Sequence, residues 1–456
     1  MYRKQDLKYL QDIFDRPSND IAVLYGKSTS GLSEILRDFS KDKEFLYYRA
    51  TAVQDQIQRQ LFAGEIHEQT RSPIFPEDDY DRLITTYINE NGDSKKLIIF
   101  GDFYWLIKAN PTFINFLSQL LFHQTKAGSV MILLVCDDIR WVENDMIRLI
   151  GRKSSEISGV IKMHAYSATE FVECFPRIPL SEAMAIYSVI GGKCRYYSEI
   201  TDESTAHSVV ISELERFADD SFEPGDFLPK DIREPAVYNT ILLNIAAGHA
   251  KLNELHNATG IDRAKLSVYL KTLIESGIVK KAVSADVGDG ANVLKGTYLI
   301  VEREEYFYYK LVYPHLSSLR VIGAERFYRR FIDQEIIPFI EEFYPHFCME
   351  HVAWLRDHDR LNFRVSSIEE YYDKAKAIGF VVVAAGGSVI ACATRYAGPH
   401  MSYQTYEDVK AAVRRNKINC DNIWLFSASG FDQKLAMFGS VTPGVRLIDG
   451  AEQRLR

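Results

Sequence analysis

The stretch IAVLYGKSTSGLS, residues 21–33, is the segment around which the first part of the chain is organised. Its first five residues form the apolar run of a buried strand, and an amphipathic segment at 33–39 follows the glycine-containing loop. Strand, glycine-rich loop and helix are the context of a phosphate-binding P-loop. The glycines of this loop have the spacing of that motif, so the candidate nucleotide-binding residues are Gly26, Lys27, Ser28, Thr29, Ser30, Gly31, Leu32 and Ser33.

One position of this loop departs from the motif. Ser33 stands at the place of the magnesium-binding hydroxyl, but Leu32 replaces the lysine. A P-loop holds phosphates with backbone N–H groups, a helix N-terminus and that lysine. Three outcomes stay open: a loop that only packs, binding of ATP or ADP with Lys27 folding back and Mg²⁺ present only with the nucleotide, and working hydrolysis.

Further apolar segments indicate a parallel sheet. Fully or largely apolar runs occur at 44–50, 95–100 and 129–136, and they alternate with segments of helical character at 51–70 and 111–122. Buried strands alternating with helices are typical of a parallel sheet that is covered on both faces. A leading helix is expected at 3–15. Residues 1–165 are therefore predicted to form an α/β P-loop domain.

The residues that follow two of these strands bear on ATP chemistry. A hydrolytic site places a magnesium-binding carboxylate and a water-orienting acid after the strand at 97–100. Here Gly101 occupies the first position, and Asp102 is the one carboxylate that remains. After the strand at 129–136 stand Asp137 and Asp138, which would repel a triphosphate unless a metal or an arginine intervened.

The middle of the chain is predicted to be helical. Residues 166–230 have the character of a helical lid, with Ser167 as a helix cap and a break at Gly191 and Gly192. Pro224, Gly225 and Pro229 indicate a linker at the end of this segment.

Residues 231–301 predict a winged helix-turn-helix. Helices are expected at 235–247, 251–258 and 263–276, with Asp262 as the N-cap of the third, and strands at 278–279 and 298–300. The exposed face of the third helix could contact a DNA backbone and base edges, although a winged helix can also serve as a packing module. The candidate DNA-binding residues are Arg263, Lys265, Ser267, Tyr269 and Lys271.

Residues 302–456 predict a second α/β core. Aromatic-rich helical segments precede a hairpin at 380–385 and 389–395, a helix at 406–415 and a closing strand at 422–427. This order is that of a restriction-endonuclease-like domain. The charged run at 302–305 is expected to be a solvated helix start. The dispersed histidines, among them His123, His346 and His351, are expected to be structural and not to bind metal.

These features together resemble the AAA-type ATPases of archaea and bacteria that combine a P-loop domain, a winged helix and a C-terminal endonuclease-like domain. The resemblance covers nearly the whole chain. It implies ATP binding and hydrolysis, DNA contact and a nuclease-like role. The segments that carry it are LYGKSTSGLSEIL (24–36), LIIFGDFYWLIKANPTF (97–113), HAYSATEFVECFP (164–176), AIYSVIGGKCRYYS (185–198) and residues 233–279.

The departures from that family are systematic. Gly26, Gly31 and Ser33 match its phosphate loop, whereas Leu32 and Gly101 replace its lysine and its magnesium-binding acid, and Asp102 stands at the place of the catalytic glutamate. In the endonuclease-like part, the strand at 380–383 lacks an acid, and Cys392, Ala393 and Thr394 replace a Glu-x-Lys motif that would hold Mg²⁺. We therefore expect a degenerate member that acts as a nucleic-acid- or protein-binding scaffold. One alternative is an ATP-binding switch coupled to DNA through the winged helix, and another is a purely protein-binding module with the aromatic-rich C-terminal region as its interface.

The composition of the chain limits which kinds of binding site and which cellular location are expected. The net charge is −8, so a positive field over the whole chain is excluded and DNA binding would need a local patch. Six cysteines without a CxxC pair argue against a zinc site or a disulfide framework, and they fit a reducing cytoplasm. The longest apolar run, 380–393, is too short to span a bilayer, and the N-terminal segment lacks an apolar signal region, so no membrane partner is expected.

Overall fold

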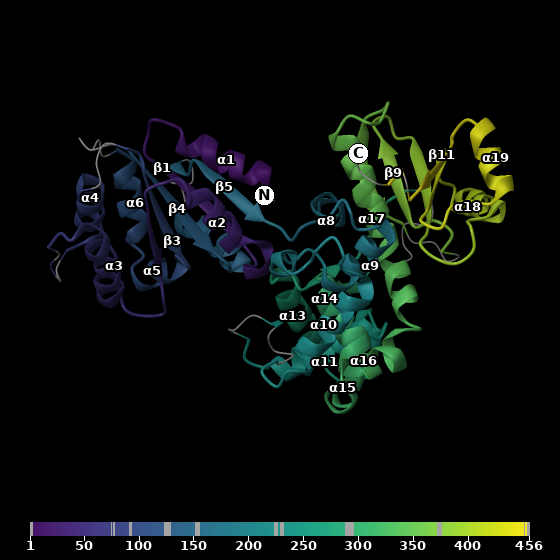
Figure 1. Ribbon diagram of the computed structural model, residues 1–456, viewed down its shortest axis with the longest axis horizontal. Helices are drawn as coiled ribbons and strands as arrows, with labels where there is room; N and C mark the ends of the chain where they lie inside the picture. Colours follow the sequence, from purple (N-terminus) through teal and green to yellow (C-terminus); the bar gives the residue numbers. More distant parts are fainter. Residues whose placement is uncertain are drawn as a thin grey trace. The chain divides into compact units, whose positions relative to one another are not determined.

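The computed structural model describes residues 3–73, 75, 78–90, 94–122, 129–150, 156–222, 227–228, 232–287, 296–371, 376–450 and 452–453. The chain forms two compact units (Figure 1). The first comprises Met1–Ala165 and Lys193–Tyr197, and the second comprises Tyr166–Gly192 and Ser198–Arg456. The linker predicted at Pro224, Gly225 and Pro229 lies outside the described residues, as does His123.

The first unit is built on a five-stranded sheet in which every pairing is parallel, as the apolar runs predict. All residues of its three inner strands are buried, because helices cover both faces. In spatial order the strands are β2 (Phe45–Arg49), β3 (Lys96–Gly101), β4 (Val130–Cys136), β1 (Asp20–Gly26) and β5 (Gly159–Met163).

Two apolar cores flank this sheet. One lies between the sheet and α1 and α2, and the other lies between the sheet and the helices that connect β2, β3 and β4. Both faces of each inner strand are therefore used for packing. The helices are α1 (Lys4–Phe14), α2 (Leu32–Ser40), α3 (Asp55–Thr70), α4 (Tyr80–Glu90), α5 (Tyr104–Ala109), α6 (Phe113–Phe122) and α7 (Ile147–Ile150).

The second unit begins with a helical section. The Ser167 hydroxyl accepts the Glu170 backbone N–H at the start of α8, and the Asp262 carboxylate accepts the Ala264 N–H at the start of α13, so both predicted caps are confirmed. The elements are α8 (Ala168–Cys174), α9 (Leu180–Ile190), α10 (Ala206–Ala218), α11 (Pro235–Ala246), α12 (Leu252–Thr259), α13 (Arg263–Glu275), β6 (Val279–Lys281), β7 (Tyr298–Ile300), α14 (Arg303–Phe307), α15 (Leu316–Ile322), α16 (Ala324–Phe327) and α17 (Ile336–Asp357).

A separate mixed sheet follows in the same unit. Its order is β12-β11-β10-β9-β8; β8, β9 and β10 run antiparallel, and β10, β11 and β12 run parallel. The prediction that the strand at 422–427 closes the fold is wrong, because α19 and β12 come after it. The elements are β8 (Val365–Glu370), β9 (Phe380–Ala384), β10 (Val389–Arg395), α18 (Tyr403–Arg415), β11 (Cys420–Ser427), α19 (Gln433–Val441) and β12 (Val445–Asp449).

The charged run at 302–305 is not a solvated helix start. Glu304 and Glu305 are buried, and Arg216 of α10 forms ion pairs with both Glu304 and Glu213. A carboxylate that leaves water is stable only when a cation or hydrogen-bond donors replace its hydration. The ion pair between Arg216 and Glu304 therefore connects α10 with α14.

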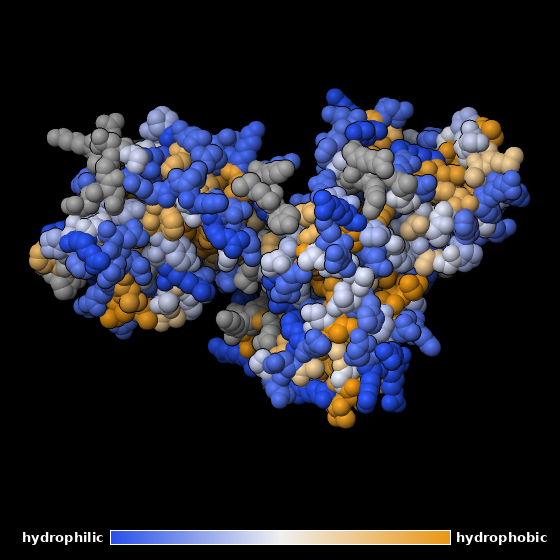
Figure 2. Space-filling view, viewed as in Figure 1, coloured by the Kyte–Doolittle hydropathy of each residue, from blue (hydrophilic) through white to orange (hydrophobic). Residues whose placement is uncertain are grey.

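Hydrophilic side chains cover most of the face shown in Figure 2, with hydrophobic residues interspersed among them. Among the described helices, none combines the length and the apolar character that crossing a membrane would require.

Candidate functional site

The loop between β1 and α2 keeps the backbone course that its glycines predict. A Cβ atom on Gly26 would lie 2.5 Å from the Met163 carbonyl oxygen of β5. Gly31 has φ +91°, and a Cβ atom there would lie 2.5 Å from the Cys194 Sγ atom. Side chains larger than hydrogen are therefore excluded at both positions. Ser28–Ser30 form one 3₁₀ turn between the two glycines.

Leu32, the first residue of α2, stands at the position of the P-loop lysine and provides no positive charge there. Its side chain is 6% exposed and belongs to the apolar core on the α2 side of the sheet, together with Leu24 of β1 and Ile35 of α2. Ser33 beside it is exposed. The position that should hold a phosphate-facing lysine thus contributes to the hydrophobic core.

The loop is also held by its own hydrogen bonds. The Ser30 backbone N–H donates to the Lys27 carbonyl oxygen at 2.9 Å, and the Ser30 hydroxyl donates to the same oxygen at 2.6 Å. Arg3 donates from Nη2 to the Ser30 carbonyl oxygen at 3.1 Å and also to the His164 carbonyl. Lys27 and Thr29 are partly exposed. Arg3 thereby connects the back of the loop to the residue after β5, a role that the sequence alone did not indicate.

Asp102 lies at the end of β3, where the sequence predicts it, but it is already paired. Arg49, the last residue of β2, donates from Nε to Asp102 Oδ2 at 2.6 Å. Beside it, a Cβ atom on Gly101 would lie 2.7 Å from the Tyr47 hydroxyl oxygen. Tyr47 therefore fills the space next to the missing acid. Neither Tyr47 nor Arg49 was predicted as a site residue, although the pairing of β2 with β3 brings both strand ends together.

The carboxylates after β4 make this edge of the sheet acidic. Loss of hydration and the nearby Asp102 raise the pKa of Asp137, and Arg49 partly opposes that rise. Asp138 accepts the Trp141 backbone N–H at 2.8 Å and so begins the next helical segment. Arg49 interacts with both Asp102 and Asp137, so two carboxylates share the charge of this arginine, which disfavours a triphosphate. Among the described residues, no three His, Cys, Asp or Glu side chains are grouped so that they could hold a metal ion.

Four of the five candidate DNA-binding side chains on α13 face solvent: Arg263, Lys265, Ser267 and Lys271. Lys271 lies 3.7 Å from Glu275 on the same helix, an exposed pair of little energetic weight. Tyr269 is half-exposed and already has partners within this unit. Its hydroxyl donates to Glu234 at 2.7 Å and its ring packs edge-on against Tyr238, because this turn of α13 contacts α11.

The segment after β6 is used for packing within the second unit. Lys280 of β6 lies 2.8 Å from Glu370 of β8, and the Ala285 backbone N–H donates to the Glu370 carbonyl oxygen at 2.9 Å. Ala285 is buried in the core of the second sheet. The described part of this hairpin segment therefore covers the edge strand β8.

The hairpin β9–β10 has no metal-binding chemistry at the expected positions. Cys392 pairs with Phe380, and both are fully buried. Cys348 of α17 is also buried, and burial raises the pKa of the Cys348 and Cys392 thiols well above the ordinary value. Buried neutral thiols do not bind a hard cation such as Mg²⁺.

Comparison with known proteins gives limited similarity. No family model matches the sequence. The chain is 25% identical over 324 residues to the "Uncharacterized protein MJECL04" of Methanocaldococcus jannaschii, and this match covers 70% of each chain. The Walker-type ATPase PABY2304 of Pyrococcus abyssi is similar in structure, with a TM-score of 0.45 and 13% identity over 68% of this chain and 95% of that one. The ORC2 protein of Aeropyrum pernix is similar with a TM-score of 0.39 and 15% identity, over 61% of this chain and 87% of that one.

Proposed function

We propose that this protein is a DNA-binding scaffold built on a degenerate ATPase unit, in which ATP hydrolysis and nuclease activity have been lost. The observation that carries the proposed loss of hydrolysis is the burial of Leu32 in the apolar core at the position of the phosphate-binding lysine. A lysine there stabilises the charge of the transferring phosphoryl group, which is worth about 3–4 kcal/mol per electrostatic contact in comparable sites.

The other groups of the loop and strand ends support the same conclusion. Asp102 is engaged with Arg49, and Tyr47 fills the space beside Gly101. A hydrolytic centre needs carboxylates that are free to position magnesium and water. The first unit is therefore proposed to contribute shape and stability, and not catalysis.

We propose that α11, α12, α13 and the β6–β7 hairpin form a winged helix-turn-helix, with α13 as the helix that contacts DNA. Arg263, Lys265 and Lys271 project from it into solvent, and Ser267 lies between them. Because Lys280 is paired with Glu370, the contact is assigned to α13 and not to this strand of the hairpin. No disulfide joins the six cysteines, all of which lie in the described part of the chain, and this supports a reducing compartment such as the cytoplasm.

The test is binding of a fluorescent DNA duplex to the full chain, followed by anisotropy at several salt concentrations. The double variant Lys265→Ala/Lys271→Ala should bind about tenfold more weakly, and the salt dependence should fall by about two ion equivalents, because two phosphate contacts are removed. Lys8→Ala/Lys41→Ala removes the same charge from exposed positions of the first unit and should bind like the wild type. Equal weakening by both pairs would mean that α13 is not the DNA-binding element.

A second candidate is a nucleotide-dependent switch. It is favoured by one observation: the loop keeps Gly31 in the left-handed conformation immediately before α2, so backbone groups at the start of this helix are still arranged as in a phosphate site. In that case ADP or ATP should raise the melting temperature of the first unit in a concentration-dependent way. The absence of any such shift would eliminate the switch and leave the scaffold.

A further inference from the structure

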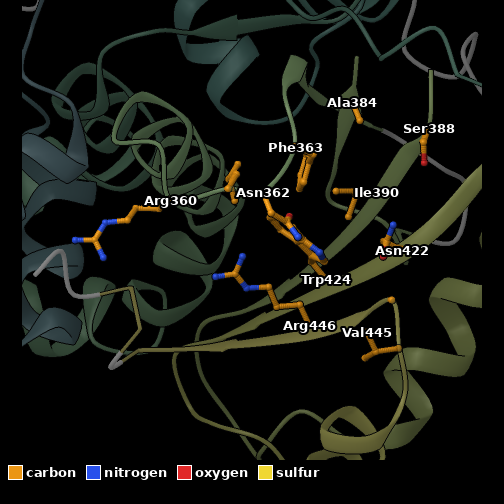
Figure 3. Close-up of a pocket in the computed structure, with 12 residues that line it drawn as sticks. Arg360, Asn362, Phe363, Ala384, Ser388, Ile390, Asn422, Trp424, Val445 and Arg446 are labelled. Carbon is orange, nitrogen blue, oxygen red and sulfur yellow. The ribbon is translucent and has the colours of Figure 1, made fainter. Parts of the chain in front are cut away.

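A cavity of about 600 Å³ lies on one face of the second sheet (Figure 3). Its floor is formed by Ile390 of β10, Trp424 of β11 and Arg446 of β12, and the segment after α17 forms another wall with Arg360, Asn362 and Phe363. The volume is in the range of cavities that hold small organic ligands. The cavity adjoins the degenerate hairpin position, because Cys392 pairs with Trp424 of the floor, but the fully buried Cys392 does not belong to the lining.

The lining divides into three chemical regions. In Figure 3 the guanidinium groups of Arg360 and Arg446 extend to one side, Asn422 and Ser388 lie on the opposite side, and apolar side chains lie between them. Trp424 and Ile390 are almost fully buried beneath this middle region. The accessible apolar surface comes from the half-buried Phe363, Ala384 and Val445, so cationic, apolar and hydrogen-bonding side chains line one space.

The contacts of the lining residues fix this arrangement. The Arg446 guanidinium lies 5.0 Å from the centre of the Trp424 ring, and the Phe363 ring lies 6.1 Å from that ring at 66°. One Arg446 nitrogen is 2.5 Å from Glu452, which holds the side chain in place and offsets part of its charge. On the opposite side, the Ser388 hydroxyl donates to Asp421 at 2.8 Å, so its oxygen is left to accept.

We propose that this cavity binds a nucleoside monophosphate group. Arginine side chains match the geometry and charge of a phosphate. The apolar middle accepts a planar base, and asparagine and serine can hydrogen-bond its edge. The source of this group is either a free mononucleotide or the phosphorylated end of a nucleic-acid strand. The site lies outside the loop of the first unit and outside α13, so it stands independently of the proposed DNA scaffold.

The proposal is tested by calorimetric titration of the full chain, without magnesium, with the four common 5′-mononucleotides. At least one should bind saturably with a stoichiometry of one. Arg360→Gln/Arg446→Gln should weaken that binding at least tenfold, and Arg326→Gln/Arg414→Gln, which removes two exposed arginines elsewhere in the same unit, should not change it. Because Arg446 also contacts Trp424, the exposed single variant Arg360→Gln is measured as well and should weaken binding at least threefold.

Three results would overturn the proposal. The first is no binding of any mononucleotide at millimolar concentration. The second is binding that is equal in the cavity variants and the wild type, which would place the nucleotide elsewhere. The third is binding of inorganic phosphate or of the bare nucleoside as tight as that of the mononucleotide. If a 5′-phosphorylated trinucleotide binds more tightly and is displaced by the mononucleotide, the source is a strand end; if it does not bind, the source is the free nucleotide.

Discussion

The side chain of Leu32 lies in an apolar core, while the loop that precedes it retains its two glycines and a closed turn. The two features have different physical origins. The glycines are required by close contacts with Met163 and Cys194, so the loop conformation persists for reasons of packing. No such contact requires a lysine at position 32, where Leu32 packs in the core instead. The conformation of the loop therefore does not depend on a cation at this position.

Replacing Leu32 by lysine should destabilise the protein without restoring hydrolysis. The change removes an apolar side chain from the core and introduces a charge, so the free energy of unfolding of the first unit should fall by about 1–3 kcal/mol. Calorimetric unfolding measures this, with Leu32→Met as the volume-matched control, for which a loss below about 1.5 kcal/mol is expected. Equal stability of Leu32→Lys and wild type would show that this position is not part of the core.

His351 of α17 should make the second unit sensitive to acid. It is 1% exposed, neither ring nitrogen has a hydrogen-bond partner among the described residues, and burial, with a smaller effect of Arg446, lowers its pKa to about 4. An unfolded histidine binds a proton below pH 6.5, whereas the folded one binds it only below pH 4. Stability is therefore lost as pH falls from about 6.5 to about 4, by up to about 3 kcal/mol.

The variant His351→Leu isolates this effect. It should be more stable than the wild type at pH 5, and the difference between the two proteins should shrink towards pH 7.5. Denaturant titration at both pH values provides the comparison. The variant must be compared with the wild type because Glu350 affects stability in the opposite direction. Burial raises the pKa of Glu350 to about 7, so its contribution to stability is lost as the pH rises. An identical pH response of variant and wild type would contradict the assignment.

The site could be predicted from the sequence only in part. Spacing in the chain identified Gly26, Gly31 and Leu32, because the motif is local. It could not identify Arg3 or Arg49, since each reaches the site from a distant part of the chain, over sequence separations of 27 and 53 residues. The contact of Tyr269 with Tyr238 could not be predicted, because helical periodicity shows which residues share a face, and not which face contacts a neighbouring helix.

At the scale of elements, the strands that are buried on both faces were predicted, as was the alternating strand β2, whereas β5, β8 and β12 were missed. β1, β3 and β4 are continuous apolar runs, and the sequence identifies each. β5 alternates buried and exposed residues over five positions, and β8 and β12 are mostly half-buried at the outer positions of their sheet. Short edge strands carry a weak pattern, so their assignment depends on neighbours that the sequence does not reveal.

The break after α9 offers an element-scale prediction. A Cβ atom on Gly192 would lie 1.9 Å from the Tyr166 carbonyl oxygen, and the Tyr166 N–H donates to the Gly192 carbonyl at 2.9 Å, so backbone packs directly on backbone. Gly192→Ala should lower the free energy of unfolding by about 3 kcal/mol or more. Calorimetric unfolding of the purified variant measures the loss.

Gly64→Ala is the matched substitution. Gly64 lies inside α3, and a Cβ atom there would have no neighbour within 4 Å. This change should stabilise the protein by about 0.5–1 kcal/mol through helix propensity alone. If both alanine variants had the same effect, close backbone packing at Gly192 would be ruled out.

At the scale of the whole molecule, the chain forms two units, and it passes between them more than once. It leaves the first unit after Ala165, returns for Lys193–Tyr197 and then remains in the second. The fold class of both parts follows from alternating apolar runs. The return of Lys193–Tyr197 to the first unit, where Cys194 contacts the loop, could not be deduced from local pattern, because helical character extends through 166–230 in the sequence.

Two units with separate cores should unfold in separable steps. Differential scanning calorimetry of the full chain should give two transitions. At pH 5, Leu32→Lys should lower only one of them, and His351→Leu should raise only the other, since distant substitutions act independently. A single transition that moves with both substitutions would show that the units unfold as one.

Phosphate release from magnesium-ATP by the full chain is the most direct test of the central claim, that the first unit has kept the fold of an ATPase and lost its chemistry. The Asp102→Ala variant serves as the control, because Asp102 is the one acid left after β3. We expect no release above buffer from either protein. Release by the wild type that Asp102→Ala abolishes would contradict the account, because it would show that the paired carboxylate and the lysine-free loop still form a working catalytic site.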